Sequence, residues 1–297
     1  MIEKNKKRAG YIAISGKPNV GKSTLLNGIL GKKIAITSSK PQTTRQQVLG
    51  IKTTDFVQML FVDTPGVHLK AGRELNRRMN KVAKAAIRDV DLVVFVTDLS
   101  WDAQDEYVLT MLKMLSIPVL LVVNKVDKAK DKAKLLPILE ERSGKMDFAA
   151  VVPVSALRKN QIEDLESLIE SMLPVGDYLY PPEQFTDRSD RFMVSEMVRE
   201  KLMRMLGQEI PYRTAVTVEL FEETKKIITI HVIIWVERKT HKGIVIGRGG
   251  EKLKRIGAES RADMEAFFEK KVCLKSWVKI KSDWSDSADF LDVIDIN

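Results

Sequence analysis

The octapeptide Gly16-Lys17-Pro18-Asn19-Val20-Gly21-Lys22-Ser23 lies between a short apolar run and an amphipathic stretch. Two glycines followed by Lys and Ser, between a strand and a helix, are typical of a phosphate-binding P-loop. The glycines let consecutive backbone N–H groups curve around a phosphate, and the helix N-terminus adds positive potential. We therefore predict that Lys22 reaches the β- and γ-phosphates of a nucleotide and that the Ser23 hydroxyl binds Mg²⁺.

Short apolar runs alternate with amphipathic stretches through the first half of the chain. Strands are predicted for residues 11–15, 59–62, 92–97, 119–123 and 150–154, and helices for residues 22–30, 69–88, 105–115 and 162–173. Short strands that are apolar at consecutive positions and alternate with helices are typical of a buried, mostly parallel sheet. The predicted fold class of this half is therefore α/β, a doubly wound P-loop domain.

Two further motifs follow predicted strands and narrow the choice of nucleotide. Asp63-Thr64-Pro65-Gly66 can hold the Mg²⁺ water shell through Asp63 and sense the γ-phosphate through the Gly66 N–H. Asn124-Lys125-Val126-Asp127 provides a carboxylate that can accept hydrogen bonds from guanine N1–H and the 2-amino group. Adenine has neither donor there and would leave the carboxylate unpaired, so the combination favours a guanine nucleotide.

The three motifs resemble, in chain order, the first, third and fourth signature motifs of translation-factor-class GTPases. Ser155-Ala156 resembles the fifth motif, whose backbone contacts the base, and residues 41–45 (Pro-Gln-Thr-Thr-Arg) resemble the second, whose threonine binds Mg²⁺ in the GTP state. Of the adjacent Thr43 and Thr44 we favour Thr44 for that role. The alternative is an ordinary solvated loop rich in Ser and Thr over residues 37–44.

This resemblance implies a Mg²⁺-dependent enzyme that hydrolyses GTP to GDP and phosphate. Nucleotide contacts are expected from Gly16, Asn19, Val20, Gly21, Lys22, Ser23, Thr24, Asp63, Gly66, Asn124, Lys125, Asp127, Ser155 and Ala156. Metal binding is expected from Ser23, Thr44 and Asp63, and the catalytic set is Asn19, Lys22, Thr44, Asp63 and Gly66. Residues 37–50 and 66–78 are the expected switch segments, released when the γ-phosphate is lost.

The residue after Gly66 shapes the expected mechanism. GTPases of the Ras type have a glutamine after this motif that orients the attacking water, whereas this chain has Val67. Intrinsic hydrolysis should therefore be slow. Asn19 resembles the asparagine that helps some related GTPases bind a K⁺ ion acting like an arginine finger. The alternative role for Asn19 is a hydrogen bond within the loop.

The character of the chain changes after residue 172. The next stretch contains Pro174, Gly176, Pro181 and Pro182, which break helices and extend the chain. We predict a GTPase domain over residues 1–172, a linker over 173–190, a second domain over 191–282 and an acidic tail over 283–297. Apolar positions at helical or alternating spacing predict the order helix, two strands, helix, strand for the second domain, a small α+β fold.

Charge is distributed unevenly along the 297 residues, whose formal net charge is +9. Residues 1–172 carry 28 basic and 19 acidic side chains, whereas residues 173–297 carry 21 of each. Within that neutral half, residues 238–281 carry 13 basic and 5 acidic side chains, and the last sixteen residues carry five Asp and no base. This polarity indicates a local site for a polyanion followed by an acidic segment that is either solvated or lies against the basic face.

A second glycine-rich motif lies inside the basic segment. Val245-Ile246-Gly247-Arg248-Gly249-Gly250 precedes a basic helix, and a GxxG loop between helices lets a nucleic-acid backbone approach closely. The order of elements and the motif resemble a type II K-homology (KH) domain, which binds short single-stranded RNA. RNA contacts are expected from Ile246, Gly247, Arg248, Gly249, Gly250, Lys252, Lys254, Lys275 and Lys279. The alternative is a basic solvated surface around a structural turn.

A GTPase of this class joined to one C-terminal KH domain resembles the bacterial Era-type GTPases over essentially the whole chain, including residues 187–192 (DRSDRF) and 199–207 (REKLMRMLG). The resemblance implies binding near the 3′ end of 16S ribosomal RNA and a role in assembling the 30S subunit. It also implies a monomer in the cytoplasm with peripheral association to the inner membrane. Composition agrees with an intracellular protein, because the single Cys273 cannot form an internal disulfide and the longest apolar run, 117–123, is too short to span a bilayer.

Two other functions compete with this interpretation. In the first, the second domain binds a protein or a membrane under GTP control and never contacts RNA. In the second, the chain is a metabolic P-loop kinase, which would need a lid over its acceptor substrate and would not need the Asn-Lys-Val-Asp motif. Salt-dependent binding of RNA would exclude the first alternative, and selectivity for guanine over adenine nucleotides would exclude the second.

Overall fold

The computed structural model describes residues 6–38, 40, 43–66, 74–129, 131, 133, 135–207 and 209–294. Its internal contacts divide the chain into two compact units. The first unit comprises Met1–Ala35, Thr44–Ala71 and Asn76–Asp187, and the second comprises Ile36–Thr43, Gly72–Leu75 and Arg188–Asn297. Both units match the predicted fold class, an α/β domain followed by an α+β domain.

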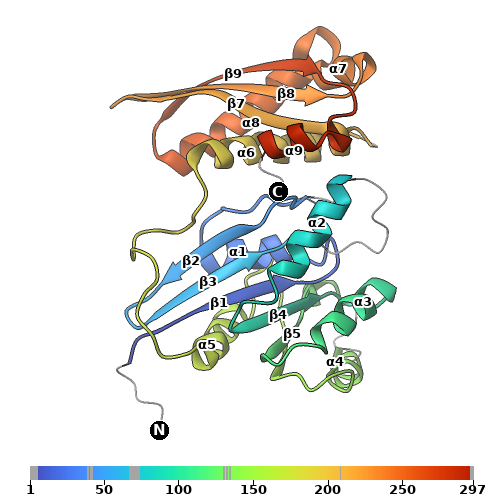
Figure 1. Cartoon of the computed structure of the whole chain (residues 1–297), viewed down its shortest axis with the longest axis vertical. Helices are drawn as coiled ribbons and strands as arrows, with labels where there is room; N and C mark the ends of the chain where they lie inside the picture. Colours follow the sequence, from blue (N-terminus) through green and yellow to red (C-terminus); the bar gives the residue numbers. More distant parts are fainter. Residues whose placement is uncertain are drawn as a thin grey trace. The chain divides into compact units, whose positions relative to one another are not determined.

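A six-stranded sheet forms the centre of the first unit (Figure 1). Its strands are β1 (Arg8–Ser15), β2 (Val48–Thr53), β3 (Val57–Asp63), β4 (Leu92–Thr97), β5 (Val119–Val123) and β6 (Ala150–Pro153), in the spatial order β2-β3-β1-β4-β5-β6. Only β2 runs antiparallel to its neighbour. The carboxyl ends of the parallel strands therefore meet along one edge, where the predicted motifs also lie.

Helices cover both faces of this sheet because alternate residues of each strand point to opposite sides. They are α1 (Lys22–Leu30), α2 (Glu74–Ala85), α3 (Ala103–Leu112), α4 (Leu135–Ser143) and α5 (Ile162–Met172). One core combines Val93, Phe95 and Leu121 of the sheet with Val108 and Leu112 of α3. Helix α1 contacts α5, β2 and β3 on the other face. The predicted strands and helices are confirmed except for the segment 69–73, which lies outside the described residues, whereas β2 and α4 were not predicted.

The proline-containing segment predicted as a linker lies along the first unit. Ala9 N–H donates to the Pro174 carbonyl at 3.3 Å, and Ile51 N–H donates to the Phe185 carbonyl at 2.9 Å. Fully buried Gln58 accepts the N–H of Leu179 at 2.7 Å. Residues 174–186 are thus held by hydrogen bonds to the sheet, and the division between the units falls at 187–188, within the predicted linker 173–190.

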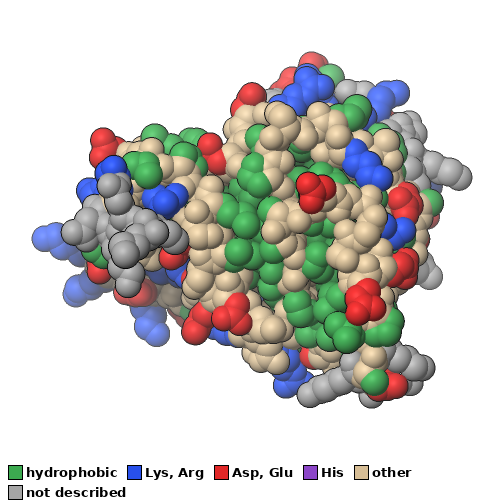
Figure 2. Space-filling view, turned by 90° about the horizontal axis from the view of Figure 1, so that it is seen from below, with side chains coloured by type: hydrophobic (Ala, Val, Ile, Leu, Met, Phe, Trp, Pro, Cys, Tyr) green, Lys and Arg blue, Asp and Glu red, His purple; other side chains and the backbone are tan. Residues whose placement is uncertain are grey.

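Apolar side chains also remain exposed on the first unit. Phe56, Val175 and Leu179 are each at least half exposed. Figure 2 views the molecule from below and shows hydrophobic side chains grouped over the middle of that face, with charged side chains around them.

No helix in the described part of the chain is long and apolar enough to cross a membrane.

The second unit contains a three-stranded sheet covered on one face by helices (Figure 1). Its elements are α6 (Asp190–Met205), β7 (Thr214–Glu223), β8 (Ile227–Val236), α7 (Lys239–Ile246), α8 (Glu251–Phe268), β9 (Lys271–Ile280) and α9 (Ala288–Val293). Strand β8 pairs antiparallel with β7 and parallel with β9. The predicted order is confirmed, with α7 and α9 as additional short helices.

Two strands depart from the simple alternation expected from the sequence. A register shift between Val218 and Leu220 of β7 turns Phe221, rather than Leu220, toward the helices. On β9, Val272 and Val278 are buried as expected, but Ile280 at the strand end is 45% exposed. The alternation between buried and exposed side chains therefore fails at the last residue of β9.

The acidic tail is packed onto the second unit rather than being free in solvent. Trp284 is fully buried, and its indole N–H donates to the Arg213 carbonyl at 3.1 Å. Phe290 and Leu291 of α9 are also buried, and the Phe290 ring meets Trp235 edge to face. Burial of each such side chain contributes about 1.5–3 kcal/mol, which is enough to hold a short segment in place. Residues 284–291 thus belong to the fold of this unit.

Candidate functional site

The predicted P-loop joins β1 to α1 through strained backbone that only certain residues tolerate. Gly16, Asn19 and Gly21 have φ values of +149°, +66° and +102°. A Cβ on Gly16 would lie 2.2 Å from the Val96 carbonyl oxygen, and a Cβ on Gly21 would lie 2.3 Å from Asn124 Nδ2. Glycine is required at both positions because a side chain would displace neighbouring strands.

Lys22 begins α1 and folds back over the loop. Its ammonium group donates to the Gly16 carbonyl at 3.0 Å and to the Lys17 carbonyl at 2.9 Å. Burial lowers the pKa of Lys22 to about 8, and nearby Asp63 partly opposes that shift. An anionic phosphate in the loop would favour the charged ammonium group, so the buried lysine suits an anion-binding role.

Three oxygen-bearing side chains meet beside Lys22. Ser23 Oγ donates to Asp63 Oδ2 at 2.8 Å and lies 2.9 Å from Thr44 Oγ1. Among the described residues, no group forms a hydrogen bond with the second carboxylate oxygen of fully buried Asp63, and burial, opposed by Lys22, raises the pKa of Asp63 to about 6. A buried carboxylate with one unused oxygen and two hydroxyls beside it fits Mg²⁺, which prefers oxygen ligands. The Thr43 hydroxyl instead donates to the Lys40 carbonyl at 2.6 Å.

Gly66 lies against the crest of the P-loop. A Cβ on Gly66 would lie 2.8 Å from Pro18 Cγ and 2.9 Å from the Pro18 backbone nitrogen. The preceding Thr64 is fixed by a 3.0 Å hydrogen bond from its hydroxyl to the Ile14 carbonyl. The two loops therefore touch through backbone atoms. Val67 and the rest of residues 67–73 lie outside the described residues, as do Pro41 and Gln42.

The two predicted base-contacting motifs are joined to the P-loop by one asparagine. Asn124 Nδ2 donates to the Val20 carbonyl at 2.9 Å, while Asn124 Oδ1 accepts the Ala156 N–H at 3.0 Å. Ser155 donates its hydroxyl hydrogen to Asp127 Oδ1. Hydrogen bonding to Ser155 holds the exposed Asp127 carboxylate in one orientation, which suits recognition of a ligand edge with two donors. The Val20 side chain is itself fully buried, so only its backbone is available.

Asp98 is a residue of this site that the sequence reasoning did not select. Its Oδ2 accepts a hydrogen bond from Lys125 Nζ at 2.9 Å, and the same ammonium group donates to the Asn19 carbonyl at 2.5 Å. Hydrogen bonds from Lys125 and Ser100 lower the pKa of Asp98, against the opposing effect of its burial. An Asp directly after a buried strand was the available signal, since such residues lie at the carboxyl edge of the sheet.

The GxxG loop of the second unit connects α7 to α8. Gly247, Gly249 and Gly250 have φ values of +76°, +59° and +82°. Arg248 is exposed at the tip. A Cβ on Gly247 would lie 2.7 Å from Lys252 Cβ, whereas Gly249 and Gly250 have open space around them. The backbone is thus accessible at the last two positions of the loop, next to cationic side chains. Ile246 and Lys252 are half-buried and Lys254 is exposed beside this loop.

The structure does not bring all the predicted RNA contacts to one surface. The helices pack on the face of the sheet that contains Val272 and Val278. Lys275 and Lys279 alternate with these positions along β9 and therefore point to the opposite face. There Lys279 forms a 3.3 Å ion pair with Glu219. Both lysines thus lie on the exposed face of β9, and their contact with RNA stays a prediction.

Comparison with known proteins agrees with both halves of this geometry. A family model described as 50S ribosome-binding GTPase matches residues 11–125, and a KH domain model matches residues 209–285. The fold and site define a P-loop GTPase with an appended KH domain. The chain belongs to the GTPase Era family and is accordingly a GTP-hydrolysing enzyme.

Two relatives and two solved structures illustrate the similarity. The chain is 55% identical over 278 residues to GTPase Era of Coxiella burnetii (strain Dugway 5J108-111), covering 94% of each chain. It is 51% identical over 287 residues to GTPase Era of Azotobacter vinelandii, covering 96% of each. An Era variant of Aquifex aeolicus bound to GDP and AlF4− has a TM-score of 0.94 at 35% identity, with 97% of this chain and 99% of that chain covered. Era in complex with MgGDPNP and nucleotides 1506–1542 of 16S ribosomal RNA also has a TM-score of 0.94 at 35% identity, with 98% and 99% covered.

Proposed function

We propose that this GTPase binds the 3′ region of 16S ribosomal RNA through its KH domain and acts in assembly of the small ribosomal subunit. The observation that carries the proposal is the exposed GxxG loop, with Arg248 at its tip and Lys254 beside it. Gly249 and Gly250 leave room for a sugar–phosphate backbone. The related Era complex with nucleotides 1506–1542 of 16S RNA supports the choice of RNA.

In the proposed GTP state, the G domain holds GTP·Mg²⁺ through the residues gathered around the P-loop. Ser23, Thr44 and Asp63 would ligate Mg²⁺, which neutralises charge on the phosphates when bound. Lys22 would contact the β- and γ-phosphates, and Gly66 N–H would contact the γ-phosphate. Loss of that phosphate would remove the contacts of Thr44 and Gly66 and so release the two switch segments. The nucleotide state would thereby control how the KH domain is presented to RNA.

A double substitution in the GxxG loop tests the RNA proposal. Arg248→Asp together with Gly249→Asp adds negative charge where the phosphate backbone would lie, and Asp tolerates the left-handed conformation of position 249. We expect affinity for a short RNA from the 3′ end of 16S RNA to fall at least about tenfold at moderate salt. Fluorescence anisotropy over a salt series would measure the affinity, with GTP hydrolysis measured in parallel.

The control reverses two charges elsewhere in the same unit. Lys225→Asp/Lys226→Asp changes an exposed turn between β7 and β8, which Figure 1 draws at the opposite end of the sheet from α7. This variant should keep most of its RNA affinity despite the larger change in net charge. If the unmodified chain bound no RNA at low salt, a GTP-regulated protein- or membrane-binding module would be the better description.

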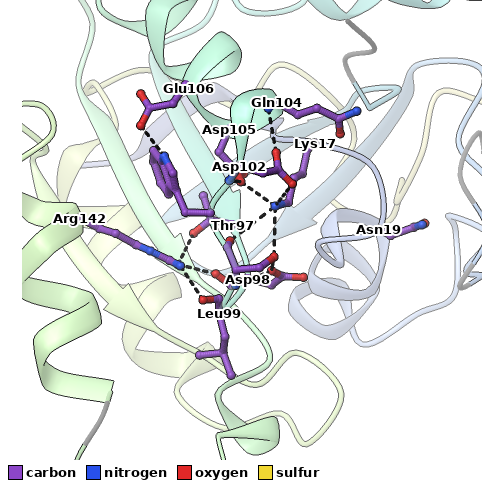
Figure 3. Close-up of polar contacts among 12 residues, drawn as sticks. Lys17, Asn19, Thr97, Asp98, Leu99, Asp102, Gln104, Asp105, Glu106 and Arg142 are labelled. Atoms are coloured by element: carbon purple, nitrogen blue, oxygen red, sulfur yellow. Dashed lines mark hydrogen bonds and ion pairs between the residues drawn. The ribbon is translucent and has the colours of Figure 1, made fainter.

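Potassium is the second ligand that we propose for the nucleotide site. Asn19 is exposed at the loop crest, and among the described residues its side-chain amide forms no hydrogen bond. Figure 3 shows this side chain pointing away from Lys17 and Asp98. We expect replacement of K⁺ by Na⁺ at equal ionic strength to lower the turnover number severalfold, and Asn19→Ala to abolish the difference. Equal turnover numbers in the two salts would rule out the potassium role and leave Asn19 as a loop residue.

Cellular placement follows from family membership rather than from a site. We propose a monomeric cytoplasmic protein with peripheral association to the inner membrane. Sequencing of RNA crosslinked to the protein in cells, together with fractionation of membranes, would test the partner and the location in one preparation.

A further inference from the structure

The second P-loop residue, Lys17, makes contacts that the P-loop motif does not require. Its ammonium group lies 2.6 Å from Asp105 Oδ2 and 2.9 Å from Asp102 Oδ2, and 3.3 Å from Ser100 Oγ. The Lys17 side chain is 7% exposed and that of Asp105 is fully buried. Figure 3 shows Asp102 and Asp105, at the start of α3, close to the Lys17 side chain.

The acidic partners are held firmly by α3 itself. Asp102 is the N-cap of α3 and accepts the Gln104 N–H at 2.8 Å, while Asp105 Oδ2 accepts the Asp102 N–H at 3.0 Å. This reciprocal arrangement is a capping box, with Asp in place of the usual Glu. Lys17 therefore binds a carboxylate pair whose geometry is fixed by the first turn of a helix.

The loop that carries this helix start is anchored from its other end. Arg142 of α4 is buried and donates to Thr97 Oγ1 at 3.2 Å and to the carbonyls of Asp98 and Leu99. Trp101 lies under both Arg142 and Lys145, whose charged groups are 5.4 and 4.8 Å from its ring centre. Residues 97–105 thus form a rigid element packed between α4 and the P-loop (Figure 3).

This rigid element holds the P-loop at two points. It binds Lys17 directly, and through Asp98 it binds Lys125, which donates to the Asn19 carbonyl. Between these points lies Pro18, which contacts Gly66. The carbonyl of Lys17 is also a partner of the Lys22 ammonium group. Displacement of Lys17 would therefore move both Lys22 and the loop that faces Gly66.

We propose that Lys17, bound by Asp102 and Asp105, is a positioning residue for the γ-phosphate side of the nucleotide site. Lys17 itself touches no phosphate in this scheme. It fixes the backbone of residues 17–19, so that Lys22 and Gly66 are already placed when GTP binds. GDP lacks the γ-phosphate, so its binding should depend less on this arrangement. The inference rests on the proposed phosphate role of Lys22.

The test compares GTP with GDP in a variant that removes the buried charges as a pair. Lys17→Met/Asp105→Asn keeps the side-chain lengths and avoids an unpaired buried charge, and the Asn oxygen can still accept the Asp102 N–H. We expect affinity for a non-hydrolysable GTP analogue to fall about tenfold and affinity for GDP to fall less than about threefold. Calorimetric titration measures both affinities, and thermal unfolding of the same samples reports folding. Lys17→Arg retains the cation and should restore the GTP affinity to within about threefold.

A matched control and two contrary outcomes complete the experiment. Lys52→Met/Glu166→Gln removes a 2.5 Å ion pair between β2 and α5, away from residues 16–23 and 97–105, so both affinities should remain unchanged. Equal losses of GTP and GDP affinity, together with a fall in unfolding temperature, would overturn the proposal and indicate that the pair only stabilises the fold. An unchanged affinity for the GTP analogue would overturn the proposal as well. Lys22→Ala tests the premise that Lys22 contacts the phosphates. If this variant bound GTP as tightly as the unmodified chain, the phosphate role of Lys22 would be wrong, and the inference about Lys17 would be wrong for that reason.

Discussion

Asp127→Asn should lower the affinity of this protein for GTP at least about a hundredfold and raise its preference for xanthosine triphosphate. The Asp127 carboxylate, oriented by the Ser155 hydroxyl, can accept hydrogen bonds from two donors on guanine. Asn presents one acceptor and one donor group, which matches xanthine, where a carbonyl replaces the 2-amino group. Competition of GTP, xanthosine triphosphate and ATP against a fluorescent guanine nucleotide measures the change.

The control for this substitution makes the same chemical change a few residues away. Asp131→Asn alters an exposed carboxylate that accepts the Ala133 N–H at 2.9 Å, and it should leave nucleotide preference unchanged. Competition by ATP as effective as that by GTP in the unmodified chain would show that Asp127 does not read the base. That result would also reopen the possibility of a P-loop kinase.

Gly66→Ala should lower the turnover number for GTP about a hundredfold while leaving GDP affinity within a fewfold. The new methyl group would lie 2.8–2.9 Å from Pro18 ring and backbone atoms, closer than a Cβ can approach. Either Pro18 or residue 66 must then move, and the Gly66 N–H would lose its place facing the γ-phosphate. Single-turnover hydrolysis separates this effect on chemistry from an effect on GTP binding.

A nearby glycine without such a contact provides the control. Gly144 follows α4, and the nearest atom to a Cβ there is the Glu141 carbonyl oxygen at 3.7 Å, an ordinary contact. Gly144→Ala should therefore hydrolyse GTP normally. Unimpaired single-turnover hydrolysis by Gly66→Ala would mean that the close approach to Pro18 is relieved without cost, and the sensing role of Gly66 would have to be abandoned.

The nucleotide site was predictable because its chemistry fixes residue types at fixed spacing. The P-loop that ends at Lys22 follows β1, Asp63 is the last residue of β3, and Asn124 directly follows β5. Parallel strands bring residues at these ends to one edge. Thr44 was the harder choice, since Thr43 is its neighbour. The structure separates the two by contact, because Thr44 reaches Ser23 whereas the Thr43 hydroxyl bonds to Lys40.

The parts that escaped prediction lack periodic or local signals. Strand β2 is interrupted by Gly50, and α4 has Pro137 in its first turn. Burial of Trp284 and Phe290 in the acidic tail could not be predicted, because aspartates and serines between them leave no apolar periodicity. The ion pair of Lys17 with Asp105 joins residues 88 positions apart in the sequence, so no local pattern in either segment predicts it. Such contacts depend on tertiary structure alone.

The approach of Gly21 to Asn124 has a consequence for how this protein can change during evolution. No side chain fits at position 21 while Asn124 retains its place, and Asn124 in turn holds Ala156 beside the expected base site. Phosphate binding and base selection therefore share one steric constraint. A lineage that altered either residue alone would lose both properties together, so substitutions at the two positions should appear only as a pair or not at all. Attempts to redesign base specificity are best confined to Asp127, which lies outside this shared constraint.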